Sequence, residues 1–163
     1  MNLGFIIKHH FFGAFREFFV YNHNSLEFRA KTFALVIGAN LEASVDNYII
    51  VKDIGMKIYK NDEDRANLLT LTTKELVQKI KENNGLDIDT LVLHIQRELK
   101  NIPRYAKKID IQSLEKLLEL TYDKDTLSYQ QNIIEFLKNL KEEILNTRKD
   151  KIKEDEEKIN SKY

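Results

Sequence analysis

Residues 87–103, which read DIDTLVLHIQRELKNIP, decide the fold class. Apolar residues recur there every three or four positions, the spacing of one face of an α-helix: Ile88, Leu91, Val92, Ile95, Leu99 and Ile102. Asp87 is placed to cap this helix. Pro103 stops it, because proline has no amide hydrogen to donate to the preceding turn. The stretch therefore predicts an amphipathic helix that needs a partner surface for its apolar face.

The same spacing continues on both sides of this helix, interrupted by short polar breaks. We expect helices over about residues 3–21, 25–39, 47–59, 72–83, 87–102, 110–121 and 128–147, with residues 61–64 as a loop or a helix start. The predicted N-terminal caps of the other helices are Ser25, Asp110, Thr72 with Glu75, and Ser128 with Gln131. Residues 47–59 are rich in β-branched side chains, so a strand competes there, but spacing and length favour a helix.

Few residues in the chain break helices: it has one proline and five glycines among 163 residues. The sequence thus predicts an all-α compact bundle of about seven helices. Residues 23–147 would form the bundle. Residues 148–163 carry six basic and five acidic side chains, and we expect a helix that projects from the bundle and then frays.

Aromatic residues concentrate in residues 1–22, which we expect to form a separate N-terminal helix. Its phenylalanines at helical spacing are the predicted interaction surface: Phe11, Phe12, Phe15, Phe18 and Phe19. Two readings stay open for this segment. It covers the bundle core, or it is a docking arm that binds a second subunit or a membrane surface.

Composition excludes several classes of protein. The absence of cysteine rules out disulfides, thiolate metal sites and thiol nucleophiles. Basic and acidic residues are equal in number, at 26 each, which argues against general nucleic-acid binding. No segment reaches the roughly 20 apolar residues that span a bilayer, and no signal peptide is visible. We therefore expect a cytoplasmic protein.

Two stretches repeat one layout, an apolar helix that runs into a short acidic turn and then a helix with an apolar seam. They are residues 33–59, hinged at residues 40–46, and residues 114–140, hinged at residues 123–128. The second, LELTYDKDTLSYQQNIIEFLKNL, resembles the tellurite-resistance TerB family and the TerB-like domain of some J-domain co-chaperones. The first, FALVIGANLEASVDNYIIVKDIGMKI, is similar in its helices. The resemblance covers about residues 26–145.

In the TerB family the turns usually read Ala-Asp-Gly with a later acid, and acid clusters suggest divalent-cation binding. Asp123 stands at the motif aspartate and Lys124 at the glycine, while Asp46 is the best acidic equivalent in the first unit. The resemblance implies a duplicated helix-turn-helix core. It also implies a weak divalent-cation site at Asp46, Asp123 and Asp125, with helix capping by these acids as the alternative. No other cofactor is indicated.

No complete catalytic set is visible. Asp123 and Asp125 fit the first positions of a calcium loop, but its glycine and its final glutamate are missing. Residues 62–64 form an acidic group that is more typical of a solvated helix cap than of acid–base catalysis. The densest basic patch joins Lys100, Arg104, Lys107 and Lys108 around Tyr105, an arrangement that could engage phosphates or stack a base.

These observations predict a non-catalytic helical interaction module that binds a protein partner or itself. The resemblance adds a role in stress response or alongside chaperones. Two alternatives remain at this point: a peripheral membrane adaptor that docks through the N-terminal aromatic helix, and a weak divalent-metal sensor that uses the acidic turns.

Overall fold

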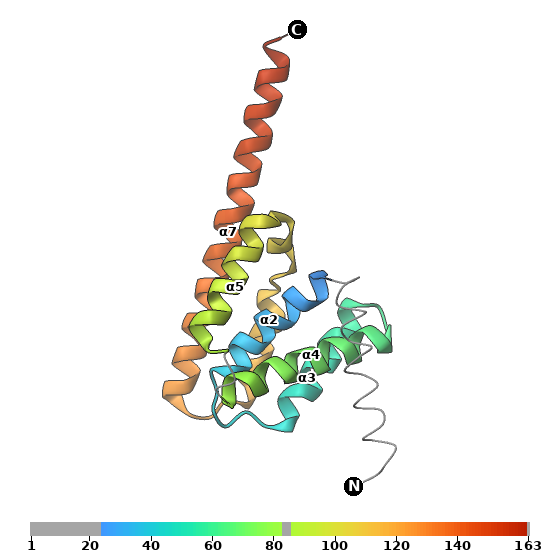
Figure 1. Cartoon of the computed structure of the whole chain (residues 1–163), viewed down its shortest axis with the longest axis vertical. Helices are drawn as coiled ribbons and strands as arrows, with labels where there is room; N and C mark the ends of the chain where they lie inside the picture. Colours follow the sequence, from blue (N-terminus) through green and yellow to red (C-terminus); the bar gives the residue numbers. More distant parts are fainter. Residues whose placement is uncertain (1–23, 83–85, 163) are drawn as a thin grey trace.

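A computed structural model describes residues 24–82 and 86–162, and every regular element in these ranges is helical. The elements are α2 (Asn24–Gly38), α3 (Val45–Ile58), α4 (Glu63–Lys81), α5 (Ile88–Asn101), η1 (Pro103–Lys108), α6 (Ile111–Lys116), η2 (Leu117–Leu120) and α7 (Lys124–Asn160). The α-helices and the two short 3-10 helices fold into a bundle from which α7 extends (Figure 1). The prediction of an all-α bundle is confirmed.

Helix α2 lies at the centre of the bundle. It packs against α4, α5, η1, α6 and α7. Its side chains are buried nearly all round, with Phe28, Phe33 and Leu35 fully inaccessible to solvent. Its second half, residues 33–38, is apolar on every side, as expected for a buried helix, whereas its first half carries Arg29 and Lys31. Ser25 lies inside α2, so the prediction that it caps this helix is wrong.

Helices α3 and α4 pack against each other, and α4 also covers α2. The competing strand interpretation of residues 47–59 is wrong, because α3 spans Val45–Ile58. The two helices approach closely at Gly55, where a β-carbon would lie 3.0 Å from the Cα of Ala66. The absence of a side chain at this position therefore permits the contact.

Helix α4 begins at Glu63, nine residues before Thr72 of the predicted capping box. Asp62 is its N-cap and accepts a hydrogen bond from the amide of Arg65 at 3.1 Å. Thr72 lies in the middle of this helix, buried, and its hydroxyl donates to the carbonyl of Leu68 at 2.7 Å. The predicted helix start at Thr72 and Glu75 is wrong, since this hydroxyl is satisfied by the preceding turn.

The boundaries predicted around residues 87–121 are confirmed. The carboxylate of Asp87 accepts from the amide of Thr90 at 2.6 Å, and α5 ends just before Pro103. Asp110 caps α6 through the amide and the hydroxyl of Ser113. A partly buried ion pair between Lys31 and Glu98, with 2.6 Å between nitrogen and oxygen, ties α5 to α2.

Helix α7 has 37 residues, which corresponds to about 55 Å at a rise of 1.5 Å per residue. Its first half packs on the core through Ile133, Ile134 and Leu137, and its second half leaves the bundle (Figure 1). Asp123 is its N-cap, so the start predicted at Ser128 and Gln131 is wrong. The helix projects from the bundle as predicted, but it continues to Asn160 without the fraying that the sequence predicted.

Within residues 24–82 and 86–162, no helix combines the length and the apolar character that crossing a bilayer requires.

Candidate interaction surface

The acidic residues predicted as cation ligands all lie at helix N-termini. Asp46 is in the first turn of α3, Asp125 is in the first turn of α7, and all three carboxylates are exposed. Asp123 accepts from the hydroxyl of Thr126 at 2.7 Å and from its amide at 2.8 Å. These hydrogen bonds, first the one from the hydroxyl, hold the pKa of Asp123 below its ordinary value.

A divalent-cation role for these acids stays a prediction. The described part of the chain contains no group of three or more histidine or acidic side chains that could hold a metal ion. The predicted phenylalanine surface, from Phe11 to Phe19, lies outside the described residues.

A buried hydrogen-bond network joins the two inter-helix turns. The hydroxyl of Thr121 donates to the Oε1 atom of Gln130 at 2.7 Å and accepts from the Nδ2 atom of Asn40 at 3.5 Å. The Nε2 atom of Gln130 donates to the carbonyl of Val36 at 2.9 Å. This carbonyl belongs to the last turn of α2, where intrahelical partners run out. The network therefore closes the C-terminal end of α2 onto α7.

Gln130 was not identified from the sequence as a buried residue, although it is only 2% exposed. A usable signal exists, since Gln130 precedes Ile133, Ile134 and Leu137 by three, four and seven residues. That spacing places Gln130 on the buried face of α7. Its polarity concealed this position, because a glutamine among apolar residues is normally exposed.

Exposed apolar side chains flank the joined turns. Leu41 is 82% exposed and Tyr122 is 87% exposed, and each directly follows a member of the network, Asn40 or Thr121. Val45, at the start of α3, is also exposed. These side chains contribute little to the core, and nothing in the described residues covers them.

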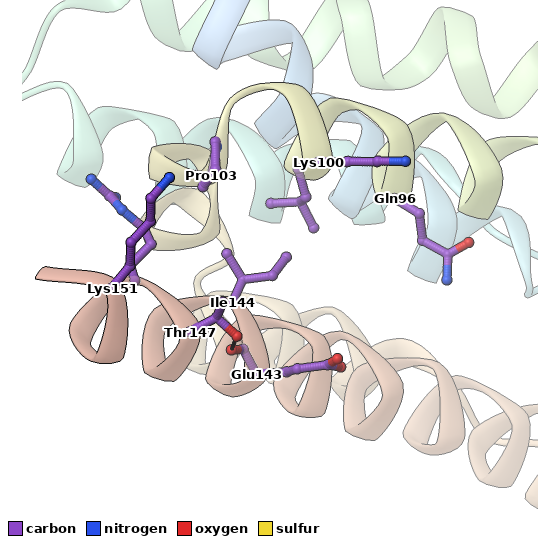
Figure 2. A pocket seen from close by; sticks show the side chains of 9 residues that line it. Gln96, Lys100, Pro103, Glu143, Ile144, Thr147 and Lys151 are labelled. Carbon is purple, nitrogen blue, oxygen red and sulfur yellow. Dashed lines mark hydrogen bonds between the residues drawn. The ribbon is translucent and has the colours of Figure 1, made fainter. Parts of the chain in front are cut away.

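A groove opens where α7 begins to leave the bundle, between α7 and the C-terminal end of α5. It has a volume of about 380 Å³ and is lined by Gln96, Leu99, Lys100, Pro103, Glu143, Ile144, Thr147, Arg148 and Lys151. Figure 2 shows Ile144 and Lys151 rising from α7 toward the chain around Pro103. Leu99 and Ile144 provide an apolar floor, while Lys100, Arg148 and Lys151 outnumber the one acid, Glu143.

The groove revises the basic patch predicted from the sequence. Lys100 lines the groove, but Tyr105 is 4% exposed and packs against Phe28 with 5.2 Å between ring centroids. The Tyr105 ring is therefore unable to stack on a nucleic-acid base, and that part of the prediction is wrong. Arg148 and Lys151, almost fifty residues further along the chain, join Lys100 instead.

Beyond the groove, α7 presents only exposed side chains. Every residue from 149 to 160 is exposed, and two of them are large and apolar, Ile152 at 55% and Ile159 at 59%. Within the described ranges, the charged residues of this segment form no ion pair. The groove and the segment 149–160 together form a continuous surface along one helix, which we call the α7 surface.

Comparisons of the chain with protein-family models, with curated proteins and with solved structures find no match. The resemblance to the TerB family, and the duplication that it implies, stay predictions.

Proposed function

We propose that the protein is a non-catalytic interaction module and that it binds a protein partner through the α7 surface. The observation that supports this proposal is the helix of residues 149–160, in which every side chain is exposed. Ile152 and Ile159 place apolar area on this helix where the core of the chain gains nothing from it.

The energetics of helices favour a binding role for such a segment. Most helices in proteins are stabilised by packing one face against another element, and helices without such packing are marginal in water. An amphipathic helix that lays its apolar positions into a groove is also a common mode of recognition. The segment 149–160 has apolar positions, and nothing within residues 24–82 and 86–162 covers them.

We extend this proposal to a role in stress response or alongside chaperones, which the resemblance to the TerB family supports. Membrane docking through residues 1–22 is an alternative, and co-sedimentation with liposomes, with and without those residues, separates it from protein binding. Divalent-metal sensing is another alternative. Calorimetric titration of calcium and magnesium into the wild type and Asp123→Ala tests that role.

The proposal is tested by photo-crosslinking in the cells that produce the protein. A photoreactive amino acid replaces Ile152 in one variant and Lys57 in a control variant, since Lys57 is exposed on α3, away from α7. We expect a crosslinked product of defined mass from position 152 and none from position 57. The absence of any product from position 152, with the protein folded and expressed, would overturn the proposed function.

A further inference from the structure

The projecting end of α7 is divided into two blocks of opposite charge. Residues 148–153 contain four basic side chains and one acidic, which gives a net charge of +3. Residues 154–158 contain four acidic side chains and one basic, which gives −3. A helix divided in this way is complementary to a copy of itself only when the two run antiparallel, because a parallel pair would place like charges side by side.

Three apolar residues of α7 are spaced evenly about Ile152, as an antiparallel pair of identical helices requires. Ile152 lies in the basic block, one residue before its end, and Ile159 follows it by seven residues. Leu145, which is partly buried against the core, precedes it by seven. Residues seven apart share one face of a helix. In an antiparallel pair centred on Ile152, the two Ile152 side chains meet, and Ile159 of each copy lies opposite Leu145 of the other.

Next to the centre of this register, Lys151 comes opposite Lys153 and Asp150 opposite Glu154, but further out acids come opposite bases. Asp155 and Glu156, three and four residues after the centre, come opposite Lys149 and Arg148, three and four residues before it. Within the residues described, none of these four side chains forms an ion pair.

The groove lies where the end of the second copy would arrive. Ile144 and Leu99 form its floor, next to the position that Ile159 of the other copy reaches in this register. Lys100 and Arg148 border that floor and would face the acidic block, while Lys151 comes opposite Lys153 of the other copy. The groove thus offers apolar and basic groups to a helix end that carries an isoleucine and an excess of acids.

From these observations, and resting on the function proposed above, we propose that the partner of the α7 surface is a second copy of the chain. The two copies form a two-fold symmetric, antiparallel pair of α7 helices centred on Ile152, and the acidic end of each occupies the groove of the other. Because the symmetry repeats every contact, each groove is filled once in the dimer. The charge pairs are exposed, so added salt weakens the dimer.

Charge reversal with mutual rescue tests the self-association of the full chain. One variant carries Arg148→Glu with Lys149→Glu, and the other carries Asp155→Lys with Glu156→Lys. Sedimentation velocity at increasing protein concentration should show a monomer–dimer equilibrium in the wild type. Each variant alone should associate about tenfold or more weakly, because like charges then face each other. An equimolar mixture should recover the affinity of the wild type.

Disulfide trapping then determines the orientation, because the chain has no cysteine of its own. Leu145→Cys and Ile159→Cys variants are mixed and oxidised. An antiparallel pair links position 145 to position 159, whereas a parallel pair links each position to itself. Far-ultraviolet circular dichroism of every variant verifies that the bundle is folded.

Three results would overturn this proposal. They are a wild type that stays monomeric at high concentration and low salt, a mixture of charge variants that fails to associate, and disulfides between like positions. Crosslinking from Ile152 in cells separates this proposal from the proposed function. A product with the mass of two chains supports self-association, while a product with a different protein contradicts self-association and leaves the proposed function standing.

Discussion

Gln130 is the residue whose replacement tests most directly how the two turns are held together. In Gln130→Met, a side chain of similar length takes its place and both hydrogen bonds of the amide are lost. The carbonyl of Val36 loses its partner on α7, and the hydroxyl of Thr121 loses its acceptor, each in a buried position. A polar group left unsatisfied in the interior costs about 1–3 kcal/mol. We therefore expect the free energy of unfolding to fall by about 2–4 kcal/mol.

For a chain of 163 residues, this loss corresponds to a decrease in Tm of roughly 4–16 °C. Thermal and urea unfolding followed by far-ultraviolet circular dichroism measures the change. Gln131→Met is the matched control, since Gln131 lies next to Gln130 on the same helix but is exposed. The control should change the free energy of unfolding by no more than about 0.5 kcal/mol.

Gln130→Glu adds a test that depends on pH. A protonated carboxyl at position 130 retains a hydrogen to donate to Val36, and a carboxylate does not. Burial raises the pKa of this carboxyl in the folded variant above the value in the unfolded chain, about 4.3. Between the two pKa values the folded state binds more protons, so stability falls as the pH rises through that window.

Measured against the wild type at each pH, Gln130→Glu should therefore be less destabilised below about pH 4.3 than at neutral pH. If Gln130→Met unfolds at the same temperature as the wild type, the network contributes nothing to stability and the reasoning is refuted. If the destabilisation of Gln130→Glu does not vary with pH, the hydrogen bond that the side chain at position 130 donates to Val36 does not contribute to stability.

Three further predictions concern helix contacts and caps. Gly55→Ala should destabilise the protein by about 1–3 kcal/mol, because the new β-carbon meets the backbone of α4. Gly38→Ala is the control, because its β-carbon meets the end of the flexible Ile80 side chain, and identical unfolding curves for the two variants would contradict this prediction. Glu98→Ala leaves the largely buried ammonium group on α2 without its partner and should cost about 1–3 kcal/mol in denaturant unfolding, whereas no loss would show that the pair is neutral. An NMR titration should give Asp123 a pKa below its ordinary value, and Thr126→Val should raise it; an unshifted value would contradict the geometry of the cap. Because the folded pKa is the lower one, the stability contributed by Asp123 is present above its unfolded pKa and is lost as the pH falls through the folded pKa.

Sequence reasoning succeeded where local signals agree with one another. In α5, an aspartate cap, a regular apolar stripe and a proline stop all indicate one helix, and the structure has that helix. It failed where a cap motif lies inside a longer helix. Thr72 and Ser128 both precede an acid or amide by three residues, but Asp62 and Asp123 had already begun the helices.

The reason for this failure is physical. A threonine hydroxyl bonds equally well to an amide at a helix start or to a carbonyl one turn earlier, so the residue pattern alone is ambiguous. Thr72 is buried against the core, and that packing selects the continuous helix. The residues next to Thr72 in the sequence do not indicate that it packs against the core.

The groove could not be predicted for a related reason. The sequence groups Lys100 with Arg104 and Lys107 because they are neighbours along the chain. The structure groups Lys100 with Arg148 and Lys151, because α5 and α7 both pack against η1 and line one groove beside Pro103. The departure of residues 148–160 from the bundle was predictable from their charge content and sparse apolar residues, but their helical conformation up to Asn160 was not.

The continuity of α7 explains how an exposed helix and a binding surface can be the same segment. Starting a helix is its most unfavourable step, and adding residues to an existing helix costs far less. In α7 that start takes place against the core, where Ile133 and Leu137 are buried, so residues 149–160 only extend a helix that already exists. A partner that binds this extension has little ordering entropy left to overcome, which lets a short surface with two exposed isoleucines support a measurable interaction. Introducing a proline at Lys149 would separate the extension from the packed half of α7, and partner binding should then be lost while the bundle unfolds at its usual temperature.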